Sequence, residues 1–273
     1  MLKFYNSGKE FLQDNSAILD KYPLETVFFD ANAKFMMRTD KNDFLVKVVN
    51  DDKFLIAVHN KDFPMVIFGS VDLCRHFAQV AVAEKLTFTK VLGTEILCEV
   101  FLKEYKILTG ATFEVNHAMD IMCCNNVLTT DVDGVETPTK KDANQLARML
   151  VDFSAEALGH DAKIDEVEND VVGRLSSFAV FRKDNRIVSL AAIKRETDKL
   201  ASIADVYTLS QYRGKGLSCK VVTYLTKKIL DSGKLPYLFV DKTNPISNHL
   251  YLKIGYTYAT PQYEYKINIA KNE

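Results

Sequence analysis

Two glycines and two cations stand close together in the stretch Gln211–Gly216, which reads QYRGKG. An apolar, β-branched run precedes this stretch and apolar residues recur at helical spacing after it, so we predict a strand, a short loop and a helix. The first N–H groups of a helix have no partner inside it and lie at the positive end of its dipole. Gly214 and Gly216 let such a backbone approach an anion closely, and Arg213 and Lys215 add charge. The chemistry that this pattern favours is the binding of a phosphate or diphosphate group.

The loop differs from the two best-known glycine motifs for phosphate. Its glycines are two positions apart rather than five and no Lys-Ser or Lys-Thr pair follows, so it is not a Walker loop, and it does not match the dinucleotide fingerprint. Taken alone, the loop leaves a structural role open, because glycine also opens helices in proteins that bind no ligand. Residues Tyr212–Gly216 resemble, nearly letter for letter, the loop that holds the coenzyme A pyrophosphate in the GNAT acyltransferase superfamily.

A second segment supports this resemblance. Asn244–Tyr256, which reads NPISNHLYLKIGY, resembles the second signature of the same superfamily: an Asn, a small residue, a Tyr, and then Gly before an aromatic residue. The two signatures follow each other in the expected order, joined by a helix and an apolar strand. Val206–Thr208 is similar to the strand end of one branch, which consists mostly of larger bacterial proteins with an additional N-terminal region. The chain is therefore identified as a member of the GNAT superfamily, with its catalytic domain in the C-terminal half.

The resemblance implies how acetyl-CoA is held as a co-substrate. The diphosphate is expected on the N–H groups of Arg213–Ser218, and the pantetheine arm is expected to lie like an additional strand beside Val206–Thr208. Asn244 matches the family position that hydrogen-bonds this arm from the other side. The full set of expected coenzyme-binding residues is Val206, Tyr207, Thr208, Gln211, Arg213, Gly214, Lys215, Gly216, Leu217, Ser218, Asn244 and Ser247.

Tyr251 occupies the family position of the general acid. A phenol has an ordinary pKa of about 10 and is protonated at neutral pH, so it can pass a proton to a leaving thiolate, whose ordinary pKa is about 8.5. The alternative is that Tyr251 only packs its ring under the sheet. Loss of turnover with unchanged coenzyme binding would indicate the first role, and equal loss of both would indicate the second.

The general base is less defined by the sequence. Asp205 lies one residue before the expected coenzyme edge and is our candidate, with Glu196 and His249 as alternatives. An acidic residue in a strand next to solvent is also often only a surface charge, and the amine can lose its proton through water. No residue type or spacing decides between these possibilities.

Composition limits the other classes of function. The chain has 273 residues with 47% hydrophobic residues, and 35 basic against 36 acidic residues give a net charge of −1. We therefore expect packed cores and no nucleic-acid partner. The N-terminal segment lacks a signal-peptide core and no apolar stretch is long enough for a membrane helix, so we expect a cytoplasmic protein with no membrane partner. The five cysteines have no metal-ligand spacing; we expect buried or half-buried free thiols and no metal.

Hydrophobic periodicity predicts two α/β domains. Residues 125–141 are polar and carry Gly134 and Pro138, so we place the N-terminal domain at 1–128 and the C-terminal domain at 129–273. The elements expected in the C-terminal domain are helices at 142–158 and 165–175, strands at 178–181, 187–194 and 200–208, a helix from 217 to about 232, a strand at 235–240, a helix at 245–254 and a strand at 256–265. This order is the one that the resemblance implies: a GNAT fold, of the α/β (α+β) class, with a mixed, mostly antiparallel sheet flanked by helices.

The N-terminal domain shows the same kind of element but no glycine-arginine loop. We expect helices at 8–22, 24–37, 71–85 and 95–108 and strands at 44–49, 54–58, 65–69 and 113–124. Two interpretations stay open: a GNAT-like fold that has lost its coenzyme loop, or an unrelated α/β accessory domain.

The leading hypothesis is an acetyl-CoA-dependent N-acetyltransferase that acts on a small amine by direct attack, as a monomer or homodimer. The alternative is a coenzyme A-binding sensor or interaction protein with little catalysis, and transfer of a longer acyl chain is a third reading. The acidic run Asp165–Asp170 would suit a cationic acceptor, but it is also typical of a solvated helix face. The acceptor is not identified by the sequence.

Overall fold

The computed structural model describes residues 1–38, 44–61, 63–159 and 161–268 and divides into two compact units. Unit 1 contains residues 1–121, 241–243 and 259–273, and unit 2 contains residues 122–240 and 244–258. The division is thus not a single cut in the sequence, whereas we predicted one boundary after residue 128. Residues 269–273, at the end of the expected C-terminal domain, lie outside the described residues.

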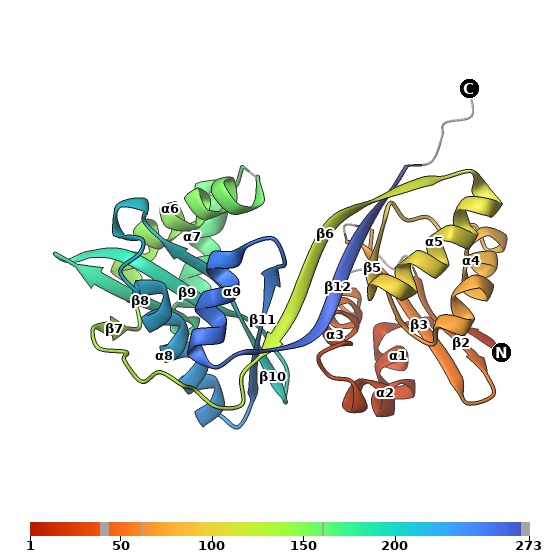
Figure 1. Cartoon of the computed structure of the whole chain (residues 1–273), viewed down its shortest axis with the longest axis horizontal. Coiled ribbons are helices and arrows are strands. Elements are labelled where there is room, and N and C mark those ends of the chain that lie inside the picture. The colour runs from red at the N-terminus through yellow and green to blue at the C-terminus, as the bar shows by residue number, and fades with distance from the viewer. Residues whose placement is uncertain (39–43, 62, 160, 269–273) are drawn as a thin grey trace. The chain divides into compact units, whose positions relative to one another are not determined.

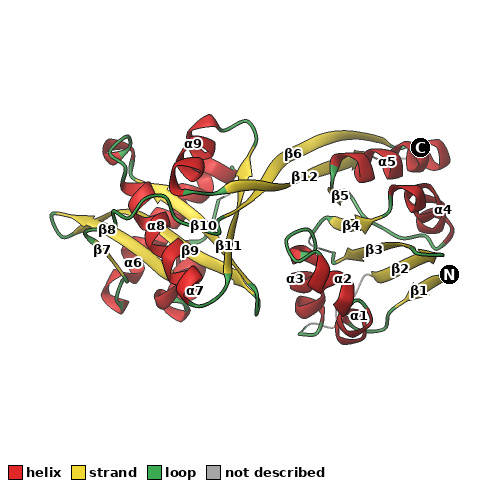
Figure 2. Ribbon diagram, turned by 60° about the horizontal axis from the view of Figure 1, so that its bottom comes forward, coloured by secondary structure: helices red, strands yellow, loops and turns green. Residues whose placement is uncertain are grey.

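Unit 1 is a sheet covered by helices on both faces (Figures 1 and 2). Its strand order is β1-β2-β3-β4-β5-β12-β6. The strands β1 to β4 form an antiparallel series, β5 runs parallel to β4, and β12 returns antiparallel to β5. The elements are β1 Leu2–Phe4, α1 Gly8–Asp14, α2 Ser16–Lys21, α3 Val27–Met36, β2 Phe44–Asn50, β3 Lys53–His59, β4 Met65–Gly69, α4 Cys74–Ala83, β5 Lys90–Gly93, α5 Glu95–Thr109, β6 Thr112–Cys123 and β12 Thr257–Asn268.

The two faces of the unit 1 sheet bury alternate residues of each strand. Leu55 of β3 packs in the core beneath α4 and α5, and the next residue, Ile56, packs in the core beneath α1 and α3. This two-residue period explains why the apolar runs in the sequence are continuous rather than alternating. The single helix predicted at 8–22 is interrupted at Asn15, which is buried and whose side-chain nitrogen donates to the carbonyl of Phe11 and the hydroxyl of Tyr5.

Unit 2 has strand order β11-β10-β9-β8-β7, with β10 antiparallel to β9 and parallel to β11. The core against α6 and α7 contains Leu190, and the core against α8 and α9 contains its neighbour Ala191, so these helix pairs cover opposite faces. The expected mixed, mostly antiparallel sheet between helices is confirmed. The elements are β7 Val135–Glu136, α6 Ala143–Phe153, a π turn Ser154–Leu158, α7 Ile164–Gly173, β8 Phe178–Lys183, β9 Arg186–Glu196, β10 Leu200–Thr208, α8 Leu217–Asp231, β11 Leu235–Asp241 and α9 Pro245–Ile254.

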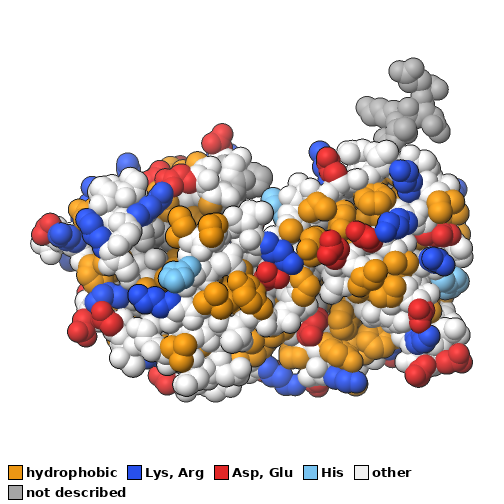
Figure 3. All heavy atoms as spheres, in the orientation of Figure 1, with side chains coloured by type: hydrophobic (Ala, Val, Ile, Leu, Met, Phe, Trp, Pro, Cys, Tyr) orange, Lys and Arg blue, Asp and Glu red, His pale blue; other side chains and the backbone are white. Residues whose placement is uncertain are grey.

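Three further expectations concern the surface charge, the cysteines and the length of the helices. On the face drawn in Figure 3, basic and acidic side chains are interspersed, as the balanced composition predicts. Three cysteines are buried and two are partly buried, and all five are free thiols, as expected. Within the described ranges, no helix has the length and apolar content needed to cross a membrane.

Candidate active site

Strand β10 is irregular at the point where the sequence predicts the coenzyme edge. Ala204 pairs with Ala192 and Tyr207 pairs with Leu190, so two residues of β10 oppose one residue of β9. The additional residue is a β-bulge, and Asp205 within it has a φ of 54°. In the part of the chain that the structure describes, β10 pairs with β11 only from Leu200 to Ser202. The later part of β10 therefore has a free edge that an extended ligand can pair with.

A cleft of about 550 Å³ opens at this edge, and it lies wholly within unit 2. Most of the residues predicted to bind the coenzyme or to act in catalysis line it. They are Val206, Tyr207, Thr208, Arg213, Gly214, Gly216, Leu217, Ser218, Asn244, Ser247 and Tyr251. Gln211, Lys215 and Asp205, which we also predicted, are not among the lining residues of the cleft.

The glycine loop has the conformation that its composition predicts. Gly214 and Gly216 both have a φ of 74°, in the left-handed region that side chains disfavour, and Gly216 is the N-cap of α8. A Cβ built at either glycine meets no atom within 4 Å. The backbone conformation, rather than lack of space, therefore requires glycine here. Leu217 and Ser218 are the first residues of the helix, where N–H groups have no partner inside it, and both residues line the cleft.

Lys215 and Gln211 lie outside the cleft and contact each other. The Lys215 ammonium donates to the carbonyl of Gln211 at 3.2 Å and lies 5.2 Å from the centre of the Tyr212 ring. Their predicted contact with the coenzyme stays a prediction.

Arg213 makes a polar cluster across the cleft with a residue that the sequence analysis missed. Its Nη2 donates to Glu156 at 2.6 Å and its Nε donates to the carbonyl of Thr208 at 2.9 Å, while the Tyr207 hydroxyl donates to Glu156 at 2.7 Å. The Arg213 guanidinium and the Tyr207 hydroxyl hold the pKa of Glu156 below its usual range. Burial and Glu156 together raise the pKa of Tyr207 to about 12.

Glu156 reaches this position because the helix predicted at 142–158 changes its winding. The α-helix ends at Phe153, and Ser154–Leu158 form a π turn. Such turns often occur at functional sites. No pattern in the sequence marks the change, so the expected regular helix gave no reason to select Glu156.

Asn244 and Tyr251 enter the cleft from α9. The Asn244 side-chain oxygen accepts the N–H of Ser247 at 3.0 Å and caps the helix, with Pro245 at the first helical position. Its side-chain NH₂ group is thus the part available to a ligand. Tyr251 lies two turns further along the same helix, so both side chains share one face.

The Tyr251 ring packs in the core and its hydroxyl borders the cleft. The side chain is 7% exposed and its ring lies 5.9 Å from that of Tyr256. Burial raises the pKa of Tyr251 to about 12. The hydroxyl has no hydrogen-bond partner among the described residues, so its proton is not engaged elsewhere. The two roles that we weighed for Tyr251, packing and proton donation, are therefore compatible in one side chain.

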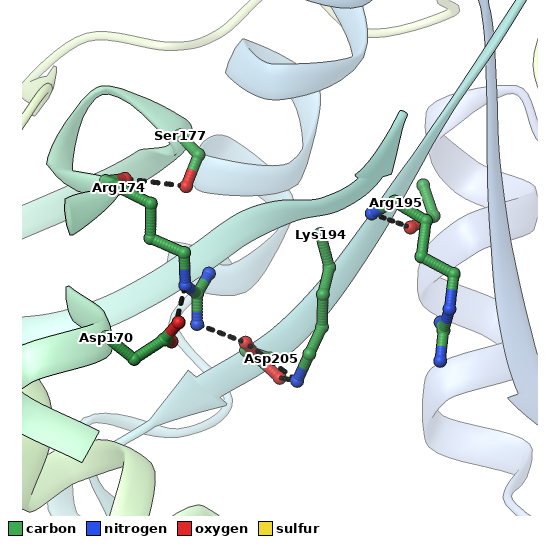
Figure 4. A network of polar contacts seen from close by, with 7 residues as sticks. Asp170, Arg174, Ser177, Lys194, Arg195 and Asp205 are labelled. Atoms are coloured by element: carbon green, nitrogen blue, oxygen red, sulfur yellow. Dashed lines mark hydrogen bonds and ion pairs between the residues drawn. The ribbon is translucent and has the colours of Figure 1, made fainter. Parts of the chain in front are cut away.

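Asp205, our candidate base, lines a neighbouring hollow rather than the cleft. Figure 4 shows its carboxylate between the side chains of Arg174 and Lys194. Its side chain is 8% exposed, and its carboxylate accepts from Lys194 at 3.1 Å and from Arg174 at 3.3 Å. Both oxygens are thus engaged by cations. The alternatives line neither space: Glu196 forms an ion pair with Lys234, and His249 is exposed on α9.

A metal is not suggested by the arrangement. Within the described residues, no group of three or more His, Cys, Asp or Glu side chains is placed to hold a metal ion. The side-chain donors of the cleft are the Arg213 guanidinium, the Asn244 amide, three tyrosine hydroxyls and three serine or threonine hydroxyls. Together with the backbone N–H groups they suit an anionic and amide-rich ligand.

Comparison with known proteins agrees with this geometry. Residues 180–265 match the family model described as FR47-like protein. Among curated proteins, no match is found. The segment that matches contains the free edge of β10 and both signatures, the first of which is the glycine loop.

Solved structures with this fold cover the whole chain. A GCN5-related N-acetyltransferase from Sphaerobacter thermophilus has 14% identity and a TM-score of 0.61, over 98% of this chain and 95% of that one. An acetyltransferase of the GNAT family from Colwellia psychrerythraea has 15% identity and a TM-score of 0.60, over 97% and 100%. A Drosophila protein has 13% identity and a TM-score of 0.58, over 100% and 99%. At these identities the likeness concerns the fold, and it includes unit 1 as well as unit 2.

Proposed function

We propose that the chain is a member of the GNAT superfamily, which its fold and the match at residues 180–265 support, and that unit 2 transfers an acetyl group from acetyl-CoA to the primary amine of a small acceptor. The fold supports a general acetyltransferase function. The donor, the acceptor class and the residue roles are our proposal. The observation that carries it is the convergence of both signatures on one cleft: the loop from Arg213 to Ser218, the free edge at Val206–Thr208, and Asn244 with Tyr251.

The cleft suits the three chemical parts of acetyl-CoA. The diphosphate binds the first N–H groups of α8, with Arg213 adding a cation. The pantetheine amides pair with the free edge of β10 and with the Asn244 side chain. The thioester then lies near Val206, where a free strand N–H polarises its carbonyl oxygen.

Transfer occurs by direct attack in a ternary complex. The neutral amine attacks the thioester carbon, a C–N bond forms and the C–S bond breaks. Tyr251 donates its proton to the departing thiolate, since a phenol with a pKa of about 12 is fully protonated at neutral pH. The proton of the amine leaves through water. We do not assign this step to Asp205, because Lys194 and Arg174 already engage its oxygens.

Two measurements on the intact chain test the proposal. Calorimetric titration with acetyl-CoA measures binding, and release of free thiol in the presence of a panel of primary amines measures transfer. We expect saturable binding together with amine-dependent thiol release. Binding without turnover for any amine would favour the coenzyme sensor instead, and no binding would contradict both readings.

A further inference from the structure

A second hollow, of about 290 Å³, adjoins the coenzyme cleft in unit 2. The two spaces share Phe153, and the π turn after it faces both, since Ser154 lines the hollow and Glu156 lines the cleft. Consecutive residues of β10 do the same: Asp205 lines the hollow and Val206 lines the cleft. An acceptor whose amine reaches the thioester beside Val206 therefore has this hollow as the adjoining space for its other atoms.

Four charged side chains of alternating sign form a chain along the wall of the hollow (Figure 4). Arg174 donates to Asp170 at 2.6 Å and to Asp205 at 3.3 Å, and Lys194 donates to Asp205 at 3.1 Å. The inner members are largely buried, with 22% of the Arg174 side chain and 8% of Asp205 exposed. The outer members, Asp170 and Lys194, are 59% and 48% exposed. A ligand can therefore contact this row of charges at Asp170 or at Lys194.

Among these four charged side chains, the two cations have unused hydrogen-bond donors. Both oxygens of Asp205 accept hydrogen bonds, whereas Nη1 of Arg174 is buried without a partner among the described residues. The Lys194 ammonium has three N–H donors, and its contacts within the described part of the chain go to Asp205 alone. The two remaining carboxylates of the hollow, Asp170 and Glu166, are 59% and 72% exposed. Each of them already has a cationic partner, Arg174 for Asp170 and Lys163 for Glu166.

We propose that the acceptor carries a carboxylate, as a small amino acid does, and that Lys194 binds this carboxylate in the hollow while the acceptor's amine faces Val206. This inference rests on the proposed function and specifies its substrate class. An acceptor carboxylate continues the alternation of charge beyond Lys194, and Asp205 and Arg174 fix the ammonium in place. Lys194 acts as a specificity-determining residue, and no further bond is made or broken beyond those of the acetyl transfer.

The test compares acceptors of equal length that differ in one terminal group. β-Alanine, propylamine and 1,3-diaminopropane present the same amine beside a carboxylate, a methyl group or a second ammonium. Glycine and 4-aminobutyrate vary the distance to the carboxylate. With acetyl-CoA as donor, we expect kcat/KM for the best carboxylate amine to exceed that for the uncharged amine of the same length about threefold, the scale of an ion pair at a half-exposed side chain. The diamine is expected to be the poorest acceptor.

Variants of Lys194 test whether this residue causes the preference. Lys194→Met is expected to raise KM for the carboxylate amine about threefold and to leave KM for acetyl-CoA and for propylamine unchanged. Lys194→Arg, which keeps the charge, is expected to retain the preference. This result would show that the loss in Lys194→Met comes from the missing charge and not from a disturbed structure. Lys183→Met removes an exposed lysine from the same hairpin and serves as the matched control with no change.

Three results would overturn the inference. They are a preference of the unaltered protein for the diamine, an undiminished carboxylate preference in Lys194→Met, and no turnover with any carboxylate amine. Acetyl-CoA binding, measured separately by thermal shift, tells whether the proposed function fails as well. If acetyl-CoA binds and propylamine is the only amine that is acetylated, this inference is wrong and the proposed function stands.

Discussion

Tyr251 shows how one side chain can stabilise the fold and serve the reaction. Its ring is part of the core against α8 and α9, while its hydroxyl borders the cleft without a described partner. A phenylalanine in its place keeps the ring contacts and removes only the acid. Removing the hydroxyl oxygen therefore separates the contribution of Tyr251 to packing from its contribution to the reaction.

We predict that Tyr251→Phe lowers kcat about 100-fold and leaves the Kd of acetyl-CoA unchanged, since general acids contribute on this scale. Thiol release and calorimetry measure the two quantities. Tyr258→Phe, at a tyrosine that is 53% exposed on β12, is the control and should change neither. Equal loss of turnover and coenzyme binding in Tyr251→Phe would leave the residue with a packing role only.

Glu156 places a negative charge where the diphosphate is proposed to bind. Its ion pair with Arg213 must open or rearrange before Arg213 can contact a phosphate, but both side chains are 49% exposed. Ion pairs with such exposure contribute little, so the effect on binding is expected to be small.

Replacing Glu156 by Gln is expected to lower the Kd of acetyl-CoA about threefold, and high salt should reduce the difference. Gln keeps an acceptor for the Tyr207 hydroxyl, so the change isolates the charge. Glu136→Gln, which removes one of the two acidic partners of Arg182 at an exposed site of unit 2, is the control. Weaker binding in Glu156→Gln would mean that the carboxylate orients Arg213 for the coenzyme instead of competing with it.

At the scale of elements, the junction of the loop and α8 combines a conformational requirement with a binding role. Gly214 and Gly216 have the left-handed conformation, and the residues that follow them at the start of the helix line the cleft. An alanine at either position strains the backbone even though space is free.

Gly216→Ala is expected to cost about 1–2 kcal/mol in the free energy of unfolding and to weaken acetyl-CoA binding at least tenfold. Gly233→Ala, at the other end of α8, has a comparable φ of 76° and equally open space. It should cost similar stability without affecting binding. Urea unfolding and coenzyme titration distinguish the two, and equal binding by both variants would contradict the phosphate role of the loop.

At the scale of the whole molecule, buried phenols and thiols make the free energy of unfolding decrease as the pH rises above about 9. Burial raises the pKa of Cys74 in unit 1 from 9.0 to about 12, and of Tyr251 in unit 2 from 10.0 to about 12. Below pH 9 the folded and unfolded chains both hold these protons, so the contribution is complete. As pH rises, the unfolded chain releases protons that the folded chain keeps, and unfolding becomes more favourable until about pH 12.

The urea midpoint of the intact chain is therefore expected to be constant from pH 7 to about pH 8.5 and to fall between pH 9 and pH 11. Tyr251→Phe should reduce the decline above pH 10, because one group that binds its proton more tightly in the folded state is removed. A constant midpoint across pH 9–11 would contradict the burial of these groups.

Local patterns determined a large part of this protein. The turn glycines, the helical spacing from Leu217 and the proline after Asn244 act within a few residues, so the sequence alone predicted the loop and the helices α8 and α9. The short strands β1, β5 and β7 were not predicted, because two to four residues carry too little periodic pattern. Most of the predicted residues that line the cleft were those that the resemblance to the superfamily implied. The proposed roles of these residues still await the measurements above.

Only the tertiary structure decided which charges meet. Glu156 and Arg213 are 57 positions apart in the sequence and come together through the π turn. The bulge in β10 is equally decisive: a strict two-residue period would put Asp205 on the face of Ile203, but the additional residue turns it toward Arg174 beneath α7. Side-chain direction in a strand depends on its pairing with the neighbouring strand, and that pairing is set by the packing of the complete sheet.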